Sequence, residues 1–234
     1  MRMTSFSYIQ YKEFKKYNKY CIIPIDKLLI VCNILHMADK TLADIVKVQL
    51  GLILDRKKAD NGFSYAYKRL TLRAMESDGI NLEAIEPFYS KEPLQEDYLT
   101  RAGTIVMKLF SPFNPVVITR ETEGYLFPSQ MVCIWPVKSV LPEYLCLYLA
   151  QDFVAERLLA NYFLIAQRAI TVDSLLNLEV RVPSLKNQRK ICDYYQNYLH
   201  IRRLREELDR EEQAMMSYVF SVLSKDGGST YVQK

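Results

Sequence analysis

The sequence predicts an α+β fold in which a mixed, twisted β-sheet domain with short helices precedes a long C-terminal helix of the coiled-coil type. Two observations on either side of Pro183 support this prediction. Before the proline, Leu178, Val180 and Val182 alternate with charged residues, which is the period-two pattern of a half-buried strand. After it, Ser184 is suited to cap a helix, and the long charged segment that follows contains neither Gly nor Pro.

The residues of this charged segment form two columns spaced by seven, as in coiled coils. The first column, apolar throughout, consists of Tyr194, Ile201, Leu208, Met215 and Val222. The second column, apolar only towards its ends, consists of Ile191, Tyr198, Arg205, Glu212 and Val219. Such a helix needs a partner along its length, which is either its own domain or another chain. About 37 residues at about 1.5 Å each span roughly 55 Å, longer than a small domain, which favours an exposed spacer or dimerising arm.

The composition is that of an ordinary globular protein, because 50% of the residues are apolar and 25% are charged. No apolar run is long enough for a transmembrane span, and no secretory signal is visible. The five cysteines are scattered and contain no C-x-x-C pair, so we expect reduced thiols in a cytoplasmic protein with no membrane contact.

The charge is concentrated in residues 1–40, which hold seven Lys/Arg against three Asp/Glu and therefore account for the whole net charge of +4. We interpret this part as a basic, aromatic N-terminal extension. Its lysines and tyrosines are suited either to stack on a nucleic-acid strand or to pack on the neighbouring domain. The predicted sheet domain covers 41–184, the spacer or dimerisation helix 185–224, and a flexible tail 225–234.

Within the sheet domain, the sequence predicts elements separated by turn signals. A short helical turn leads into a strand that ends at Gly51, and a basic loop with an Asn-Gly turn follows at 56–62. Further strands are expected at 63–72, 101–110 and 116–119, two more within 125–136, and the last before Pro183, whereas 74–100 is expected to be loops and short elements. Helices are expected at 141–150, where proline stands at the start, and at 151–163. A polar loop is expected at 166–175, and it leads into a short turn capped by Asp173 or Ser174.

The sequence shows no set of residues suited to catalysis. Only seven glycines occur, without a phosphate-binding loop, and the two histidines, His36 and His200, are isolated. Acidic pairs such as Glu121 and Glu123 are interpreted as charged side chains that are exposed to solvent at the surface. We therefore expect a binding module without catalytic residues, metal or cofactor.

The order of these pieces resembles the specificity subunits of type I restriction-modification enzymes, in particular one target-recognition domain with its spacer helix. The four similar segments are 42–51 ("L-x-D-I-x-x-x-x-x-G"), 99–108 ("L-x-x-G-D-I-L-x-x", with Thr104 for the aspartate), 125–149 (a strand followed by "x-P-E-Y-L-x-x-x-L") and 170–191 ("I-s-x-x-D-L-x-x-I-x-I-P-x-P-x-x-E-Q-x-x-I"). The chain departs from the family pattern at 166–169, where a Gly/Ser-rich loop is usual, at 111–115, and in the "E-Q" pair, which is Asn187-Gln188.

The resemblance implies sequence-specific recognition of double-stranded DNA, without chemistry of its own, and a role in holding methyltransferase (modification) and restriction subunits. A full specificity subunit has two recognition domains and two antiparallel helices, whereas this chain resembles half of one. A homodimer through antiparallel C-terminal helices would read a symmetric split site. Pairing centred near Leu208 and Asp209 would bring Arg205 opposite Glu212 of the second copy.

DNA contacts are expected from basic and polar residues on one face of the recognition domain, because Lys and Arg bind phosphates and Arg, Gln, Asn or Ser read bases. The candidates are Arg56, Lys57, Lys58, Tyr67, Lys68, Arg69, Arg73, Gln167 and Arg168. Each is also explained as a solvated surface residue. A function of a different class stays open, namely a protein-interaction scaffold that uses the long helix and does not bind DNA.

Overall fold

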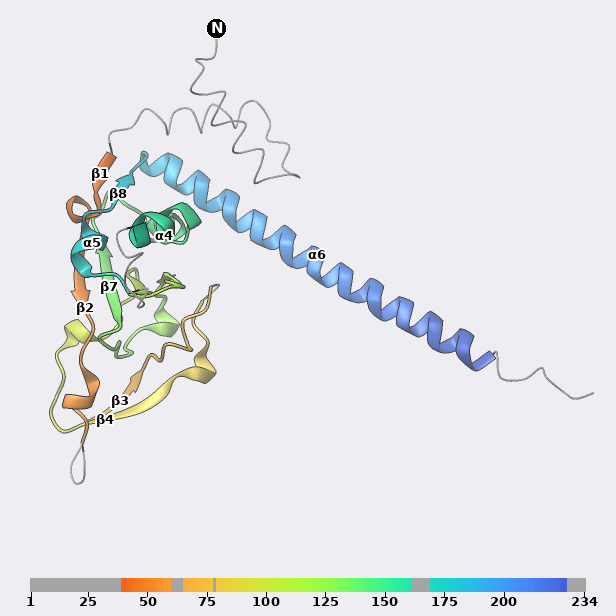
Figure 1. The fold of residues 1–234 in the computed structure, drawn as a ribbon, viewed down its shortest axis with the longest axis horizontal. Coiled ribbons are helices and arrows are strands. Elements are labelled where there is room, and N and C mark those ends of the chain that lie inside the picture. The colour runs from red at the N-terminus through yellow and green to blue at the C-terminus, as the bar shows by residue number, and fades with distance from the viewer. Residues whose placement is uncertain (1–38, 60–64, 78, 161–168, 227–234) are drawn as a thin grey trace, which may run out of the picture. The chain divides into compact units, whose positions relative to one another are not determined.

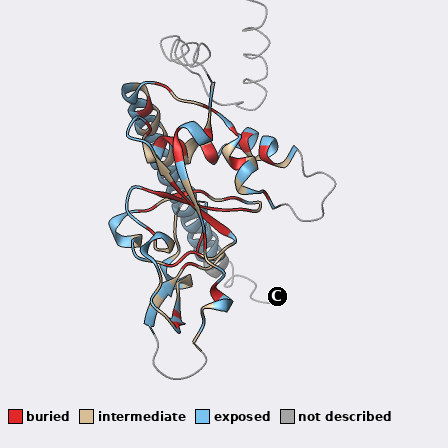
Figure 2. Ribbon diagram, turned by 90° about the vertical axis from the view of Figure 1, so that its left-hand side faces the viewer, coloured by how far each residue is buried: buried red, intermediate tan, exposed pale blue. Residues whose placement is uncertain are grey.

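A four-stranded antiparallel sheet in the order β2-β7-β5-β6 forms the centre of the fold. Its strands β2 and β7 are labelled in Figure 1. Its strands are β2 (Val46–Leu50), β7 (Met131–Pro136), β5 (Ile105–Lys108) and β6 (Val116–Val117). The structure is a computed structural model, and it describes residues 39–59, 65–77, 79–160 and 169–226. All four residues of β5 are buried, so the sheet is covered on both faces, and Figure 2 shows buried residues gathered along it.

The two faces of the sheet carry separate apolar clusters, as strand alternation requires. Ile105 and Met107 of β5 join a cluster with residues of three short helices, α3 (Pro142–Leu149), α4 (Asp152–Leu159) and α5 (Val172–Leu176). Val106, between them, joins a second cluster with residues from the loops on the other face. The helices therefore cover one face, and irregular segments cover the other.

Two further strand pairs flank the sheet. The strand β1 (Asp39–Thr41) pairs with β8 (Glu179–Arg181), and β3 (Tyr65–Arg69) pairs antiparallel with β4 (Glu86–Ser90). Short 3-10 turns connect these elements: η1 (Leu42–Asp44), η2 (Leu54–Arg56), η3 (Leu82–Ala84), η4 (Glu96–Tyr98) and η5 (Arg120–Thr122). Isolated parallel bridges join Leu52 to Pro128 and Arg69 to Leu126 and give the pairing its mixed character. The predicted α+β fold class is confirmed.

Gly51 directly follows β2, where the backbone meets the segment before β7. A Cβ atom at this position would lie 2.0 Å from the carbonyl oxygen of Pro128, so no other residue fits without moving the backbone. The Gly51 N–H donates to the Met131 carbonyl, and the Leu52 N–H donates to the Phe127 carbonyl. This close approach explains why the first of the four similar segments ends on glycine.

The C-terminal helix α6 (Leu185–Asp226) has 42 residues and begins directly after Ser184, as predicted. At about 1.5 Å per residue it spans roughly 63 Å. Gln188, which is completely buried, fixes its first turn. The Gln188 side chain accepts the Leu141 N–H at 2.7 Å and donates to the carbonyls of Ser139 at 2.9 Å and Pro183 at 2.7 Å.

Several local predictions are wrong. Residues 125–136 contain one strand, β7, rather than two, because 126 and 128 form only isolated bridges. The segment 74–100, expected to contain loops and short elements, does so, but one of these elements is the strand β4, which was not predicted as a strand and whose Pro87 does not fit the usual strand pattern. The cap of α5 is Thr171, which accepts the Ser174 N–H, rather than Asp173 or Ser174.

Some predictions fall outside the described residues. These are residues 1–38 of the basic and aromatic extension predicted at 1–40, the last part of the helix expected to reach 163, and the tail after 226. The DNA candidates Gln167 and Arg168 also lie outside them. The chain divides into two compact units, 1–39 and 40–234, and the fold described above belongs to the second.

Candidate nucleic-acid interface

The β3–β4 ribbon carries three of the nine predicted DNA-binding residues, namely Tyr67, Lys68 and Arg69. Its register pairs Ala66 with Tyr89, Lys68 with Pro87, and Arg69 with Glu86. Successive side chains of a strand point to opposite faces, so Lys68 points away from the face that carries Arg69. Lys68 is exposed beside Tyr89, which is 54% exposed, and both border a shallow hollow of about 520 Å³.

The basic segment 56–58 lies along the other end of β4. Lys58 forms an antiparallel bridge with Ser90, and the Lys91 N–H donates to the Lys57 carbonyl at 3.0 Å. The ribbon therefore gains a third, short extended segment. Two stretches of sequence predicted to bind DNA, 56–58 and 67–73, are thereby brought to one substructure.

The cations of segment 56–58 differ in their surroundings. Lys57 forms an ion pair with Glu92, and this hydrogen bond holds the pKa of the Glu92 carboxyl below its usual value. Arg56 and Lys58 are exposed. A phosphate can therefore approach Arg56 and Lys58 directly, whereas it competes with a carboxylate at Lys57.

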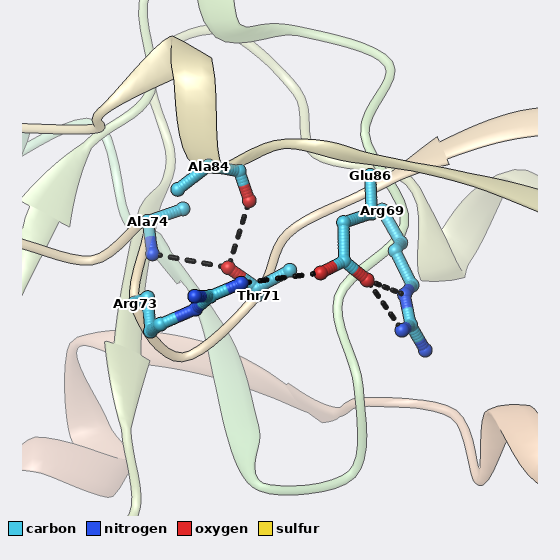
Figure 3. A network of polar contacts seen from close by, with 6 residues as sticks. All are labelled: Arg69, Thr71, Arg73, Ala74, Ala84 and Glu86. Atoms are coloured by element: carbon cyan, nitrogen blue, oxygen red, sulfur yellow. Dashed lines mark hydrogen bonds and ion pairs between the residues drawn. The ribbon is translucent and has the colours of Figure 1, made fainter.

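Two arginines share the carboxylate of Glu86 at the opposite end of the ribbon (Figure 3). Arg69 donates from Nε at 3.2 Å and from Nη2 at 2.6 Å, both to Oε2 of Glu86. Arg73 approaches Oε1 with its Nη2 at 3.5 Å. The hydrogen bond and the charge of Arg69 lower the pKa of Glu86, so this carboxylate is ionised at neutral pH.

The loop that carries Arg73 is held by hydrogen bonds on both sides. The Thr71 hydroxyl donates to the Ala84 carbonyl at 2.8 Å and accepts the Ala74 N–H at 3.2 Å (Figure 3). On the other side, the Met75 carbonyl accepts Asn114 Nδ2 at 2.8 Å. The backbone at Arg73 is thus fixed, although its side chain is 82% exposed.

The remaining DNA candidates are placed differently. The Tyr67 hydroxyl accepts the Leu94 N–H at 2.9 Å, and its ring packs beside the buried Phe88 cluster, so Tyr67 has a clear role in the fold. Gln167 and Arg168 lie outside the described residues. The described residues resume at Ala169, beside the end of β5. Ala169 forms an antiparallel β-bridge with Phe110, and the Ile170 N–H donates to the Leu109 carbonyl.

The helix α6 presents the predicted partner column to solvent. Ile201 is 49% exposed, Leu208 55% and Met215 68%. Tyr194, Tyr198 and Val222 are exposed as well, together with the charged Arg205 and Glu212. Contiguous exposed apolar surface of this kind is typical of an interaction site.

The described residues offer little for catalysis. They contain no group of three or more His, Cys, Asp or Glu that could hold a metal ion. Burial raises the pKa of the Cys133 thiol to about 11 and that of Cys146 to about 12, which leaves both thiols protonated and weakly nucleophilic at neutral pH. Within the described ranges, no helix is long and apolar enough to cross a bilayer.

Three residues that organise these surfaces were not found from sequence. Glu86 and Glu92 are the carboxylate partners of predicted DNA residues, but they lie in a segment that shows no clear periodicity. Gln188 stands in the fourth segment of similarity, yet its role as the anchor of α6 depends on backbone groups more than 40 residues away.

The sheet domain, the ribbon with its exposed cations and the long helix with its exposed apolar stripe together define a binding module joined to a helical arm. Comparison with known families makes this more specific. A family model described as the type I restriction modification DNA specificity domain matches residues 34–210. The chain belongs to this family.

Solved structures show the same fold. The HsdS subunit from Thermoanaerobacter tengcongensis matches with a TM-score of 0.65 and 14% identity, over 84% of this chain and 51% of that one. A chain solved in work on complex assembly and conformational transition of the type I R-M system matches with a TM-score of 0.56 and 15% identity, over 78% of this chain and 43% of that one. This chain spans about half the length of those it matches. No curated protein sequence matches it.

These findings confirm the predicted resemblance, including the fit of one domain plus one C-terminal helix to a half-subunit. They support a role in DNA sequence recognition and do not favour the alternative of a scaffold without DNA binding.

Proposed function

We propose that this chain reads a DNA sequence as half of a type I specificity subunit and performs no covalent chemistry itself. The observation that carries the proposal is the ribbon, because β4 joins the two basic segments 56–58 and 67–73 in one substructure of a specificity domain. Its exposed cations, Arg56, Lys58, Lys68 and Arg73, are suited to contact phosphates and bases.

The DNA role is tested by the salt dependence of binding. The full chain is titrated with duplex DNA at several salt concentrations, and the Lys57→Ala/Lys58→Ala variant is compared with a Lys190→Ala control on α6. Removal of one phosphate-binding cation should reduce the slope of log K against log salt by about 1. Because Lys57 is already paired with Glu92, the single Lys58→Ala variant should account for most of the change. An unchanged affinity and slope would remove this segment from the interface.

We further propose that two copies pair through antiparallel α6 helices. The charge of α6 is strongly divided, which supports this orientation. Residues 185–205 contain six Lys/Arg and one Asp, whereas 206–223 contain five Asp/Glu and one Arg. In a register centred near Leu208 and Asp209, Arg205 faces Glu212 and Arg210 faces Glu207 of the other copy, whereas parallel, in-register pairing would place each of these charges beside its own copy.

The antiparallel arrangement also suits the two columns. Centred near Leu208 and Asp209, it sets Arg205 opposite Glu212 of the second copy and sets Ile201 near Met215. The exposed apolar column would then be buried along its whole length. A pair of this kind would present two recognition domains to a symmetric, split DNA site.

Charge reversal tests the pairing by sedimentation of the full chain. Arg205→Glu and Glu212→Arg should each weaken the dimer, and the double variant should restore it. Arg203→Glu, two residues from Arg205 and outside both columns, is the matched control and should have a smaller effect. Failure of the double variant to restore a dimer that both single variants abolish rules out this register.

The same helices are proposed to hold the methyltransferase and restriction subunits, as the family resemblance implies. Co-purification of the full chain with its modification subunit tests this part separately. A Leu208→Asp variant should lose the dimer, and retention of the modification subunit by this variant would show that the two interactions use different surfaces.

A further inference from the structure

We propose that Arg73 reads a guanine and that Glu86 is the residue that positions it. This assignment rests on the proposed DNA-reading function and adds to it the base that one residue recognises. Arg73 is singled out by three features of its surroundings, namely a fixed backbone, an orienting carboxylate and an exposed guanidinium.

The first feature is the fixed backbone. Residue 73 lies between Thr71, which is tied to Ala84 and Ala74, and Met75, whose carbonyl accepts Asn114 Nδ2 at 2.8 Å and Lys108 Nζ at 3.4 Å. Lys108 reaches this carbonyl from the end of β5, so the loop is tied to the central sheet. A fixed attachment point reduces the conformational entropy that an arginine loses when it binds.

The second feature is that the two carboxylate oxygens of Glu86 contact different arginines (Figure 3). Its Oε2 is occupied by two donors of Arg69, at 2.6 and 3.2 Å, which fixes the carboxylate. Its Oε1 faces one Nη2 of Arg73 at 3.5 Å. Arg69 is 36% exposed and held on two donors, whereas Arg73 is 82% exposed and held on one. Glu86 therefore orients the Arg73 side chain while engaging only one of its guanidinium nitrogens.

The third feature is the exposed guanidinium, which could bind either a phosphate or a base. A guanidinium has five N–H donors, and among the described residues Glu86 is the only side chain paired with that of Arg73. A phosphate that approaches Arg73 would also meet the ionised Glu86, whose negative charge weakens its attraction to Arg73. The O6 and N7 edge of guanine is uncharged, accepts two hydrogen bonds, and is the commonest specific partner of arginine. The arrangement therefore favours a base over the backbone.

The test selects bound sequences from a pool of random duplexes with the full chain, its Arg73→Lys variant, its Glu86→Gln variant and an Arg120→Lys control. Arg120 is an exposed arginine of η5 for which the structure shows no acidic partner among the described residues. Arg73→Lys keeps the positive charge but loses the fork of two parallel donors. Circular dichroism of each variant confirms that the fold is kept.

In the expected result, the wild-type chain selects a motif with at least one G·C position, and Arg73→Lys loses preference at that position by on the order of 10- to 100-fold. The other positions and the affinity for unrelated DNA stay unchanged. Glu86→Gln weakens the same position less, and Arg120→Lys changes nothing. A motif identical in the wild type and in Arg73→Lys overturns the assignment, as does a loss spread evenly over all positions. If the wild-type chain binds no DNA, the proposed function itself fails.

Discussion

Replacement of Gln188 by leucine should loosen the joint between the domain and α6. The wild-type amide satisfies three backbone groups, the N–H of Leu141 and the carbonyls of Ser139 and Pro183, at 2.7 to 2.9 Å. Leucine has a similar volume but no polar atom, so these groups lose their partner. A buried group left without a hydrogen bond costs about 1–3 kcal/mol.

The position of each group sets the size of the effect. Ser139 is exposed, so water can replace the amide at its carbonyl, whereas Pro183 is buried and Leu141 partly so. Two groups then remain unsatisfied, and we expect Gln188→Leu to lower the free energy of unfolding by about 2–5 kcal/mol. Urea denaturation followed by circular dichroism measures this change, with Lys186→Ala, an exposed residue of the same turn, as the control.

A glutamate at position 188 adds a pH test of the same geometry. One carboxylate oxygen can accept the Leu141 N–H, but the other would face two carbonyl oxygens, which disfavours the charged form and raises the pKa of this glutamate in the folded state. The protonated form can donate to one carbonyl. Gln188→Glu should therefore be most stable below the unfolded pKa of about 4.3 and lose stability as the pH rises through the folded value. A Gln188→Leu variant as stable as the control, or a Gln188→Glu variant whose stability rises with pH in this range, would refute the reasoning.

Three further predictions address other parts of the domain. Gly51→Ala should lower the free energy of unfolding by about 3 kcal/mol or more, because the added methyl group would lie 2.0 Å from the Pro128 carbonyl oxygen. Urea denaturation measures this change, and a value below about 1 kcal/mol would contradict the close approach. Glu86→Gln should flatten the acid-induced loss of stability. The lowered pKa of Glu86 stabilises the fold at pH values above its unfolded-state pKa, and this contribution disappears as the pH falls through its folded-state pKa. Equal melting curves from pH 5 to 3 for both proteins would contradict this. Cys133 and Cys146, whose pKa values burial raises, should react with iodoacetamide at pH 8 far more slowly in the native than in the unfolded chain, as followed by peptide mass spectrometry.

The parts of the fold that were predicted correctly depend on local patterns. The alternation of Leu178, Val180 and Val182 predicts β8, and the absence of Gly and Pro after Ser184 predicts α6, because each pattern reflects the periodicity of one element. The strand β4 was missed because Pro87 interrupts its pattern and because its main support, pairing with β3, comes from a segment about 20 residues away.

In the candidate interface, too, local sequence patterns predicted some features, whereas others depend on pairing between separate segments. The sequence identified the basic residues of the ribbon by type, but it could not show which of them have a carboxylate partner. Lys57 finds Glu92 and Arg69 finds Glu86 only after β3 and β4 pair. The pairing separates cations tied to a carboxylate from Arg56, Lys58 and Lys68, which are exposed.

The sequence by itself determined the fold class, most of the elements in their order, the long helix with its apolar column, and the likeness to one specificity family. These follow from residue periodicity and from short motifs, which neighbouring residues encode. Only the tertiary structure decided which side chains meet: Glu86 with two arginines, Gln188 with three backbone groups, and segment 56–58 with β4. Hydrogen bonds and ion pairs act over about 3 Å, and which groups come within that range depends on how distant segments pack.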